Sequence, residues 1–582
     1  MKKSVFVIAI MTIIISCTTK KEVTNEDADT KFSNLETVLL DSYWKQYPSL
    51  SIFNGYGKYY EKLVIPGSAA VAANISFSHQ WLDSLNTLNY DSLLDNNKIS
   101  FRIIKNQLES DLWYQSVFKQ QEWDASIYNM SNDCYYIINQ PYAPLDERLR
   151  ILSSRLQHAD DYYAAAFKML REPVREYAEL SMKQNKGGLS IFGTELTDSI
   201  NASHLTDEEK NTLDRNITKT VNAINMFVDS LKGMLDDKNY KFRDFRIGKE
   251  MFSQKFKYDL VIDLTPEELY AKATADKKFY DNEMFRIADS LWISCYPGKS
   301  KPKDTLAVVQ SVIDKISLQH ASPEHFFDTL TNHVFELKKF IISKNLFDFD
   351  TTYPVKVRIM PAYERGFSLA SAEFTPAYQK QGDTYYNVDD LTLYPKEKSE
   401  SALKEYNSYS SQLLSIHEAM PGHCLQGIYN NKKSPDVVRS VFQNGAMIEG
   451  WAVYTESMML ENGWGNNSPE MTLIHDKLKL RELANVIIDY DIQCLNKPKE
   501  DIMHLLVNEC FQTSAQAEEK YHRATVSQVQ LCSYFAGSTA IKSLREEYKN
   551  KMGDKYILKD FHEKFLSYGS SPVKYIREEM LK

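Results

Sequence analysis

Apolar residues recur along most of the chain at intervals of three, four and seven positions, the spacing of one face of an α-helix. The clearest run is formed by Leu149, Leu152, Leu156, Tyr163, Phe167 and Leu170. Pro144 lies near the start of this run and Pro173 near its end, where proline is typical of a helix boundary. We therefore expect one helix between the two prolines.

Two longer amphipathic segments begin with helix-capping residues. Segment 205–235 opens with Thr206 and three acidic residues, and segment 264–291 opens with Thr265 before Pro266. Threonine is a preferred N-cap because its hydroxyl accepts a hydrogen bond from a backbone N–H that the helix leaves unpaired. No internal repeat and no strong central linker interrupts the pattern, so a mainly α fold is expected.

One region departs from the helical pattern. Residues 353–361 alternate apolar and polar positions and then stop at a proline, and residues 384–388 are β-branched and aromatic. The turn-forming segment 373–383 separates them. Both are predicted to be short strands of a small sheet. In a peptidase such a strand could pair with an extended substrate backbone, and a purely structural hairpin is the alternative.

Composition limits the class of protein and its partners. The 582 residues are 43% hydrophobic and 25% charged, which is typical of a globular protein with a large core. The formal net charge is −9 and there is no long cluster of lysine and arginine, so nucleic acid is not expected as a partner. The 36 tyrosines are expected mainly in the core, although tyrosine also suits a wet cleft.

The N-terminus carries a targeting signal. Two lysines precede an apolar run of about a dozen residues, too short to cross a membrane, that ends in Ile-Ile-Ser before Cys17. This pattern resembles a bacterial lipoprotein signal, which implies removal of residues 1–16 and lipidation of Cys17. Residues 17–33 contain few apolar side chains and are predicted to be a flexible tether to a domain over 34–582. The domain would then face the periplasm or the cell exterior, anchored only by lipid; a retained anchor helix is the alternative.

Six other cysteines are spread along the chain. They are too few for a disulfide-stapled scaffold of this length, and no two follow the C-x-x-C spacing. We therefore expect no zinc site built from cysteine.

The stretch IHEAMPGHCLQ carries the candidate chemistry. A helix predicted over 399–420 leads into His417 and Glu418, which begin a zinc-protease motif. In the usual HExxH motif the second histidine follows the first by four residues, but here that position is Pro421 and the histidine is His423. On an undisturbed helix a separation of six residues turns the second histidine roughly 120° away, so the two could not share an ion.

The residues between the histidines resolve this mismatch. Pro421 lacks the N–H that would bond to the carbonyl of His417, and its ring clashes with that carbonyl. Gly422 accepts backbone angles that other residues avoid. The helix is therefore expected to break or bulge, which loops out two residues and returns His423 to the place of a four-spaced histidine.

A second predicted helix, residues 444–459, supplies two carboxylates. Glu449 lies downstream of His423 at a distance typical of zinc peptidases whose third ligand is a glutamate. Glu456 is two turns further on the same face, where it could hydrogen-bond a ligand histidine. The glycine and tryptophan that follow Glu449 indicate close packing, and a solvated helix face is the alternative.

The motifs HEAMPGHCLQ and EGWAVYTE together resemble those of the bacterial proteins grouped as domain-of-unknown-function family 885, described as zincin-like peptidases. The segments DERLRILSSRLQHADDYYAAAFKML, FRIGKEMF and VKVRIMP are similar to other parts of that family. More distantly, the motifs are similar to helical gluzincin peptidases such as angiotensin-converting enzyme. The resemblance implies a mainly α, zincin-like (gluzincin) fold, with two lobes around a deep channel that favours short peptides and a small β-sheet near the active site.

Three positions depart from the family pattern. The family often has two histidines after Pro-Gly, whereas here the second is Cys424. The Asp-x-Gly-x-His run of the family is represented by DYDIQ, with Gln493 in the place of the histidine. Gln530, Ser533 and Tyr534 are kept, but the Pro-Gly that precedes this glutamine in the family is absent. These changes leave the predicted metal ligands intact and put the substrate preference in doubt.

These residues predict a zinc-dependent metallopeptidase that binds one zinc ion per chain. His417, His423 and Glu449 would hold the ion and leave a fourth position for water. Bound zinc would lower the pKa of that water and polarise the scissile carbonyl. Glu418 would accept the water proton and pass it to the leaving amine.

Related metallopeptidases stabilise the tetrahedral intermediate with a tyrosine or histidine from a later segment. Tyr534 is the first candidate here, and His522 and Arg523 are the others. Short peptides are the expected substrates. Two other functions stay open: a peptide-binding lipoprotein that has lost catalysis, against which the intact Glu418 argues, and a metal hydrolase of non-peptide amides or esters.

Overall fold

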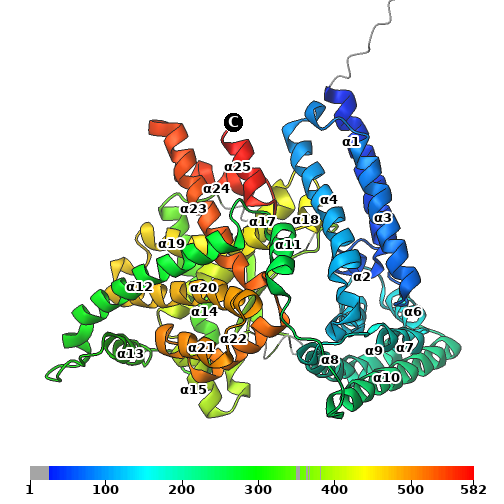
Figure 1. The fold of residues 1–582 in the computed structure, drawn as a ribbon, viewed down its shortest axis with the longest axis horizontal. Coiled ribbons are helices and arrows are strands. Elements are labelled where there is room, and N and C mark those ends of the chain that lie inside the picture. The colour runs from blue at the N-terminus through cyan, green and yellow to red at the C-terminus, as the bar shows by residue number, and fades with distance from the viewer. Residues whose placement is uncertain (1–24, 349–353, 362–364, 366–367, 380–381) are drawn as a thin grey trace, which may run out of the picture.

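The computed structural model describes residues 25–348, 354–361, 365, 368–379 and 382–582. They form a mainly α-helical protein with one three-stranded sheet (Figure 1). The predicted signal peptide, Cys17 and the predicted tether up to residue 24 lie outside the described residues. Within the described part, no helix combines the length and the apolar character that crossing a membrane requires.

The helices before the sheet are α1 (Asn25–Gln46), α2 (Pro48–Phe53), α3 (Ser68–Asn86), α4 (Asp95–Trp113), α5 (Ser131–Asn139), α6 (Leu145–Leu156), α7 (Ala159–Met169), α8 (Arg175–Gly188), α9 (Thr194–Ala202), α10 (Asp207–Asp236), α11 (Gly248–Leu260), α12 (Pro266–Cys295), α13 (Thr305–Ile316) and α14 (Pro323–Ser343). The strands are β1 (Val355–Ile359), β2 (Ala370–Glu373) and β3 (Thr384–Val388). The helices after the sheet are α15 (Lys396–Glu405), α16 (Ser410–Glu418), α17 (His423–Lys433), α18 (Val438–Val441), α19 (Gly445–Glu461), α20 (Pro469–Leu495), α21 (Lys499–His504), α22 (Ser514–Val526), α23 (Ser533–Met552), α24 (Leu558–Leu566) and α25 (Val573–Met580).

Residues 25–33, predicted to belong to the tether, are instead the first turns of α1. Ala28 and Phe32 are buried there, four residues apart on one face. The ring centroid of Phe32 lies 6.2 Å from that of Phe101 on α4. The segment is mostly polar, and two apolar side chains at helical spacing are enough to dock it against a neighbouring helix.

Two helices, α6 and α7, replace the single helix predicted between Pro144 and Pro173. They are separated at His158, whose backbone is not helical (φ −114°, ψ 22°). The prediction of one helix was therefore wrong, although its apolar face is continuous in the core through Leu149, Leu152, Leu156 and Tyr163. No glycine or proline lies at the break, so the sequence gives no local signal for it.

Helix starts agree with the sequence where capping residues define them. Both Thr206 at α10 and Thr265 at α12 form capping boxes, in which each threonine side chain accepts a hydrogen bond from a backbone N–H of the first turn. The helix predicted over 399–420 is divided into α15 and α16. The division occurs at Asn407, whose side-chain oxygen accepts a hydrogen bond from the N–H of Tyr409 (3.0 Å).

Three groups of buried apolar residues form the interior. One group lies among α5–α10, and a second joins α1, α3 and α4. The largest lies chiefly among α11–α14, the sheet and the helices that follow it. Figure 1 shows α1, α3 and α6–α10 on one side of the molecule and α12–α15 with α19–α23 on the other.

The sheet has the strand order β1-β3-β2, with β1 parallel and β2 antiparallel to β3. The predicted segments 353–361 and 384–388 contain β1 and β3, so the prediction of a small sheet is confirmed. β2 was not predicted, because its sequence ASAE has no β-branched or aromatic residue. Its strand conformation depends on pairing with β3.

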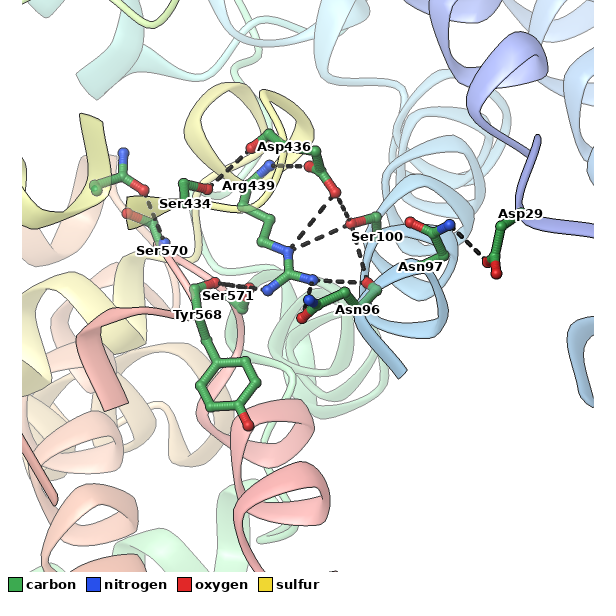
Figure 2. A network of polar contacts seen from close by, with 11 residues as sticks. Asp29, Asn96, Asn97, Ser100, Ser434, Asp436, Arg439, Tyr568, Ser570 and Ser571 are labelled. Carbon is green, nitrogen blue, oxygen red and sulfur yellow. Dashed lines mark hydrogen bonds and ion pairs between the residues drawn. The ribbon is translucent and has the colours of Figure 1, made fainter. Parts of the chain in front are cut away.

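A buried arginine joins the N-terminal helices to the later part of the chain (Figure 2). The Arg439 guanidinium is fully buried and donates to the backbone oxygen of Asn96 on α4 (2.7 Å) and to that of Tyr568 (3.1 Å). It also lies 3.9 Å from a carboxylate oxygen of Asp436. Because one cation is held by groups from separate segments, α4 is fixed against α18 and the chain between α24 and α25.

Candidate metal centre

The histidine motif is divided between two helices. α16 ends at Glu418 and α17 begins at His423, so the predicted break between the histidines is confirmed. The chain between them folds back on α16, and the N–H of Gly422 donates to the carbonyl of Ile416 (2.9 Å). His423 therefore starts a new helix instead of continuing the first one.

The turn between the two helices depends on a glycine and on a tryptophan. A Cβ atom at residue 422 would lie 1.8 Å from the carbonyl oxygen of His417, so no other residue fits there. The indole N–H of Trp451, a fully buried residue of α19, donates to the carbonyl of Pro421 (3.0 Å). The tryptophan near Glu449 thus fixes the turn from the side of α19.

Three side chains with ligand atoms converge: His417 on α16, His423 on α17 and Glu449 on α19. The Oε2 atom of Glu449 lies 3.7 Å from Nε2 of His417 and 3.5 Å from Nε2 of His423. Ligands about 2.0–2.1 Å from a tetrahedral zinc ion are separated from one another by roughly 3.4 Å. Two imidazole nitrogens and one carboxylate oxygen at this spacing fit a zinc-sized cation.

Neighbouring side chains orient both imidazoles. Nδ1 of His417 donates to Oε1 of Glu456 (2.7 Å), which leaves its Nε2 directed towards Glu449. Nδ1 of His423 lies 3.5 Å from Oε1 of Gln426. Gln426 was not among the predicted site residues, although its position three residues after a helical histidine places it on the same face.

The pKa values in the cluster reflect burial opposed by these contacts. Burial alone would lower the pKa of His417, but hydrogen bonds to Glu449 and Glu456 raise it well above its usual value. Burial alone would raise the pKa of Glu449, but both histidines hold it below its usual range. Burial raises the pKa of Glu418 against the attraction of the two histidines. The carboxylates thus stabilise protons on the imidazole nitrogens. A divalent cation bound between these side chains can take the place of those protons.

Glu418 connects the cluster to the sheet. It is the last residue of α16, and the backbone N–H of Ala372 on β2 lies close enough to its carboxyl to lower the pKa of that group. Among the described strands, β2 pairs with β3 alone, so it forms an edge of the sheet. The candidate base is therefore positioned by an edge strand.

Two cavities flank the start of α19. One, of about 590 Å³, lies along α5, α17 and the chain that follows β2, and Gln426 is part of its lining. The other, of about 480 Å³, lies between α4, α11 and the start of α23, and Glu449 and Ser533 line it. Gln443 and Ile448 line both. The space beside the ligand cluster therefore extends to both sides of α19.

The three oxyanion candidates lie on two helices. Tyr534 is half-buried in the first turn of α23. His522 and Arg523 are exposed on α22, and Arg523 donates to Oε1 of Gln530 (2.8 Å). Gln530 lines the same cavity as Glu449. The described contacts therefore connect Arg523 to this cavity, and they do not do so for His522.

A close crossing of α19 and α23 fixes Tyr534 relative to the ligand helix. A Cβ atom at Gly450 would lie 2.3 Å from the carbonyl carbon of Gly537, and one at Gly537 would lie 1.7 Å from the carbonyl oxygen of Ala446. The two backbones touch here because both positions are glycine. Tyr534 is one turn before this contact on α23, and Glu449 is the neighbour of Gly450 on α19.

Two positions that depart from the expected pattern make contacts of their own. Gln493, buried on α20, accepts a hydrogen bond from the N–H of Ile247 (3.1 Å) and donates to the carbonyl of Ala524 (3.0 Å). The buried thiol of Cys424 lies 3.6 Å from the carbonyl oxygen of Tyr385. Gln493 therefore joins α20 to α22 and to the start of α11, and Cys424 joins α17 to β3.

Residues 48–580 match the family described as "Bacterial protein of unknown function (DUF885)". The chain belongs to this family. A structure of a candidate lipoprotein of unknown function from Shewanella oneidensis is similar to this DUF885 protein, with 39% identity, a TM-score of 0.87 and coverage of 95% of this chain and 100% of that chain. A candidate lipoprotein from Colwellia psychrerythraea shares the fold, with 16% identity, a TM-score of 0.76 and coverage of 96% and 99%. No curated protein matches the chain.

Proposed function

We propose that this DUF885 protein is a zinc-dependent metallopeptidase. The observation that carries the proposal is the convergence of His417, His423 and Glu449, from three separate helices, at separations that suit one zinc ion. The adjacent Glu418 supports catalysis over ligand binding alone, because binding would not need a base beside the ligands. The family and the similar structures carry no assigned activity, so the proposal rests on this geometry.

The residues around the cluster have distinct roles in the proposed reaction. Zinc, when bound, would lower the pKa of a water molecule and polarise the scissile carbonyl. Glu418 accepts the proton of the attacking water and delivers it to the leaving amine nitrogen. Tyr534 donates a hydrogen bond to the developing oxyanion from the start of α23. Glu456 keeps His417 in the tautomer whose Nε2 faces the ligand position.

The edge strand favours peptides as substrates. Among the described strands β2 pairs with β3 alone and lies beside Glu418, and an extended peptide can add to such an edge strand through backbone hydrogen bonds. The 590 Å³ cavity runs along the chain that follows β2 and has room for several side chains. We infer that the two cavities belong to one deep channel between two helical lobes of a gluzincin-like fold, which admits short peptides and excludes folded proteins.

We further infer that Cys17 is lipidated and anchors the protein to a bacterial membrane, facing the periplasm or the exterior. The short apolar run before Cys17 supports this location, and so do the descriptions of the two similar structures as candidate lipoproteins. Cys17→Ser should abolish lipid labelling in a bacterial host. Unchanged labelling of that variant would refute the anchor.

Metal analysis tests the central proposal. The purified protein should carry about one zinc ion per chain, and His423→Ala should lower the zinc affinity strongly because one of three protein ligands is lost. His504→Ala is the matched control, since His504 is an exposed histidine of α21. Full zinc occupancy in the His423→Ala protein would show that the two histidines do not share an ion.

A further inference from the structure

A cluster of cations lies beyond the start of α23. It consists of Arg481 on α20 with Lys520 and Arg523 on α22. We propose that this cluster binds a carboxylate of the peptide substrate. The inference rests on the proposed peptidase function, because it names the chemical group by which that site selects its peptide.

Arg481 is an accessible cation on a mostly buried helix. Its neighbours Leu480, Glu482 and Leu483 are buried, and α20 packs against helices on several sides, including α12, α16, α22 and α23. Figure 1 shows α20 in the middle of the later helices. Arg481 nevertheless keeps 41% of its side chain accessible. The guanidinium of Arg481 is therefore within reach of a ligand, although the helix that carries it is mostly buried.

The cations of the cluster outnumber the carboxylates that face them. Glu405 is shared by Lys477 (2.7 Å) and Arg481 (3.9 Å). Lys520 donates to the amide oxygen of Asn485 (2.5 Å), and among the described residues it forms no ion pair. Arg523 likewise donates to an amide, that of Gln530, and forms no ion pair with a described carboxylate. Among the described residues, Glu405 is therefore the one carboxylate in an ion pair with the cluster, and Lys520 and Arg523 have none.

A bound carboxylate would stabilise the charged form of Lys520 beside the two guanidinium groups. A cation removed from water recovers its hydration energy only through a partner of opposite charge. Burial lowers the pKa of Lys520 well below its usual value, and the nearby Arg481 and Arg523 lower it further. The planar guanidinium of arginine and the ammonium of lysine are the groups that recognise carboxylates in proteins. A peptide carboxylate would supply the missing negative charge.

The cluster is connected to the metal centre through Gln530. Arg523 holds Gln530, and Gln530 lines the 480 Å³ cavity together with Glu449. The phenol of Tyr534, at the start of the same helix as the cavity-lining Ser533, lies close enough to influence the pKa of Arg481. A peptide bound across the metal ligands can therefore extend one end towards these cations.

The experiment compares three peptides of equal length that differ only in their carboxylates. The first is N-acetylated with a free C-terminus, the second is its C-terminal amide, and the third is an amide with a glutamate side chain near its end. Dissociation constants are measured by calorimetry on the metal-free full chain, in which hydrolysis does not interfere. The first or the third peptide should bind about tenfold to a hundredfold more tightly than the uncharged one.

Variants that remove or keep one positive charge show which residues cause the preference for acid over amide peptides. Lys520→Met should reduce the difference between acid and amide peptides to less than about threefold, and Lys520→Arg, which keeps the charge, should retain most of it. Arg481→Met provides a second test if Lys520→Met does not fold. Tighter binding of only the first peptide identifies the C-terminal carboxylate, and tighter binding of only the third identifies an acidic side chain.

Equal binding of all three peptides by the wild-type chain would overturn the inference. An unchanged preference in both Lys520→Met and Arg481→Met would overturn it as well. The peptidase proposal fails separately, if the zinc-loaded wild type cleaves none of the peptides. A carboxylate preference that survives such a failure would still establish the binding site.

Discussion

α10 and α20 are long helices that differ in what they bury. α10 has 30 residues and α20 has 27. α10 buries an apolar stripe and exposes its charged residues to solvent, as an amphipathic helix does. α20 is enclosed on most sides and buries many polar and charged side chains: His475, Asp476, Lys477, Lys479, Glu482, Asn485, Asp489, Asp491 and Gln493.

The apolar side chains that α10 buries stabilise the fold, whereas the polar and charged side chains that α20 buries cost free energy. Each large apolar side chain buried by α10 contributes roughly 1.5–3 kcal/mol to stability. The charged groups of α20 lose hydration and recover it only through partners, such as the ion pair of Lys479 with Glu482 (2.8 Å). α20 packs beside α16, α22 and α23, which carry candidate site residues. Substitutions near α20 should therefore change chemistry and pH dependence, and substitutions in α10 should change stability alone.

The largest expected effect comes from Glu418 on α16. Glu418→Gln keeps the size of the side chain but cannot accept a proton, so kcat should fall by about 10²–10⁴-fold. Zinc content and Tm should stay close to those of the wild type. Glu397→Gln, an exposed glutamate of α15, is the control. Turnover near the wild-type rate in Glu418→Gln would mean that this carboxylate is structural. The helices around α20 would then not differ from α10 in having a role in chemistry.

A core substitution in α10 tests the opposite side of the comparison. Phe227 is buried there and its ring centroid lies 5.2 Å from that of Tyr163 on α7. Phe227→Ala should lower the free energy of unfolding by about 3–5 kcal/mol through lost burial and a cavity. The neighbouring Met226 is 71% exposed, so Met226→Ala should have little effect. Denaturant unfolding measures the free energies of unfolding of both variants. A changed kcat or zinc affinity in folded Phe227→Ala would contradict the expectation that α10 affects stability alone.

Regular amphipathic elements could be predicted from local sequence. The start of α10 follows from Thr206 and its capping box, and the break between the motif histidines follows from Pro421 and Gly422. Features set by distant contacts could not be predicted. β2 is a strand because it pairs with β3, and residues 25–33 are helical because Phe32 docks on α4.

The same distinction applies to the candidate site. Spacing alone suggested His417, His423 and Glu449, and the structure brings these three together. The approach of Ala372 to Glu418 could not be predicted, since Ala372 belongs to a strand that the sequence did not reveal. The enclosure of α20 was also hidden, because its charged residues are typical of an exposed helix.

Tyr534→Phe tests whether the chemistry extends to α23. If its hydroxyl donates to the oxyanion, its removal should lower kcat by about 10²–10³-fold, or about 2.7–4 kcal/mol in the barrier. Zinc content and Tm should hardly change, because only a hydroxyl is lost. Tyr548→Phe is a control on the same helix. Normal kcat in Tyr534→Phe would transfer the role to Arg523 or His522, and lost stability would show that Tyr534 is a core residue.

A buried acid of α20 should reveal itself only in the pH dependence of stability. Burial raises the pKa of Asp489 to about 8, and its carboxylate lies 3.6 Å from the thiol of Cys532. In the unfolded chain an aspartate titrates near a pKa of about 3.9. Between these two values the folded protein holds a proton that the unfolded chain has released. Stability should therefore fall as the pH rises through this window, by about 1.4 kcal/mol per pH unit.

Asp489→Asn removes this proton linkage while keeping the shape of the side chain. The variant should lose less stability than the wild type between pH 5 and pH 8, and the difference should grow with pH, because asparagine stays neutral throughout. Asp229→Asn, at an exposed position of α10, should leave the slope of the wild type unchanged. Free energies of unfolding from denaturant titrations at several pH values give the three slopes. Equal slopes for Asp489→Asn and the wild type would show that Asp489 is ionised in the fold, and that α20 accommodates this charge as readily as α10 accommodates its exposed ones.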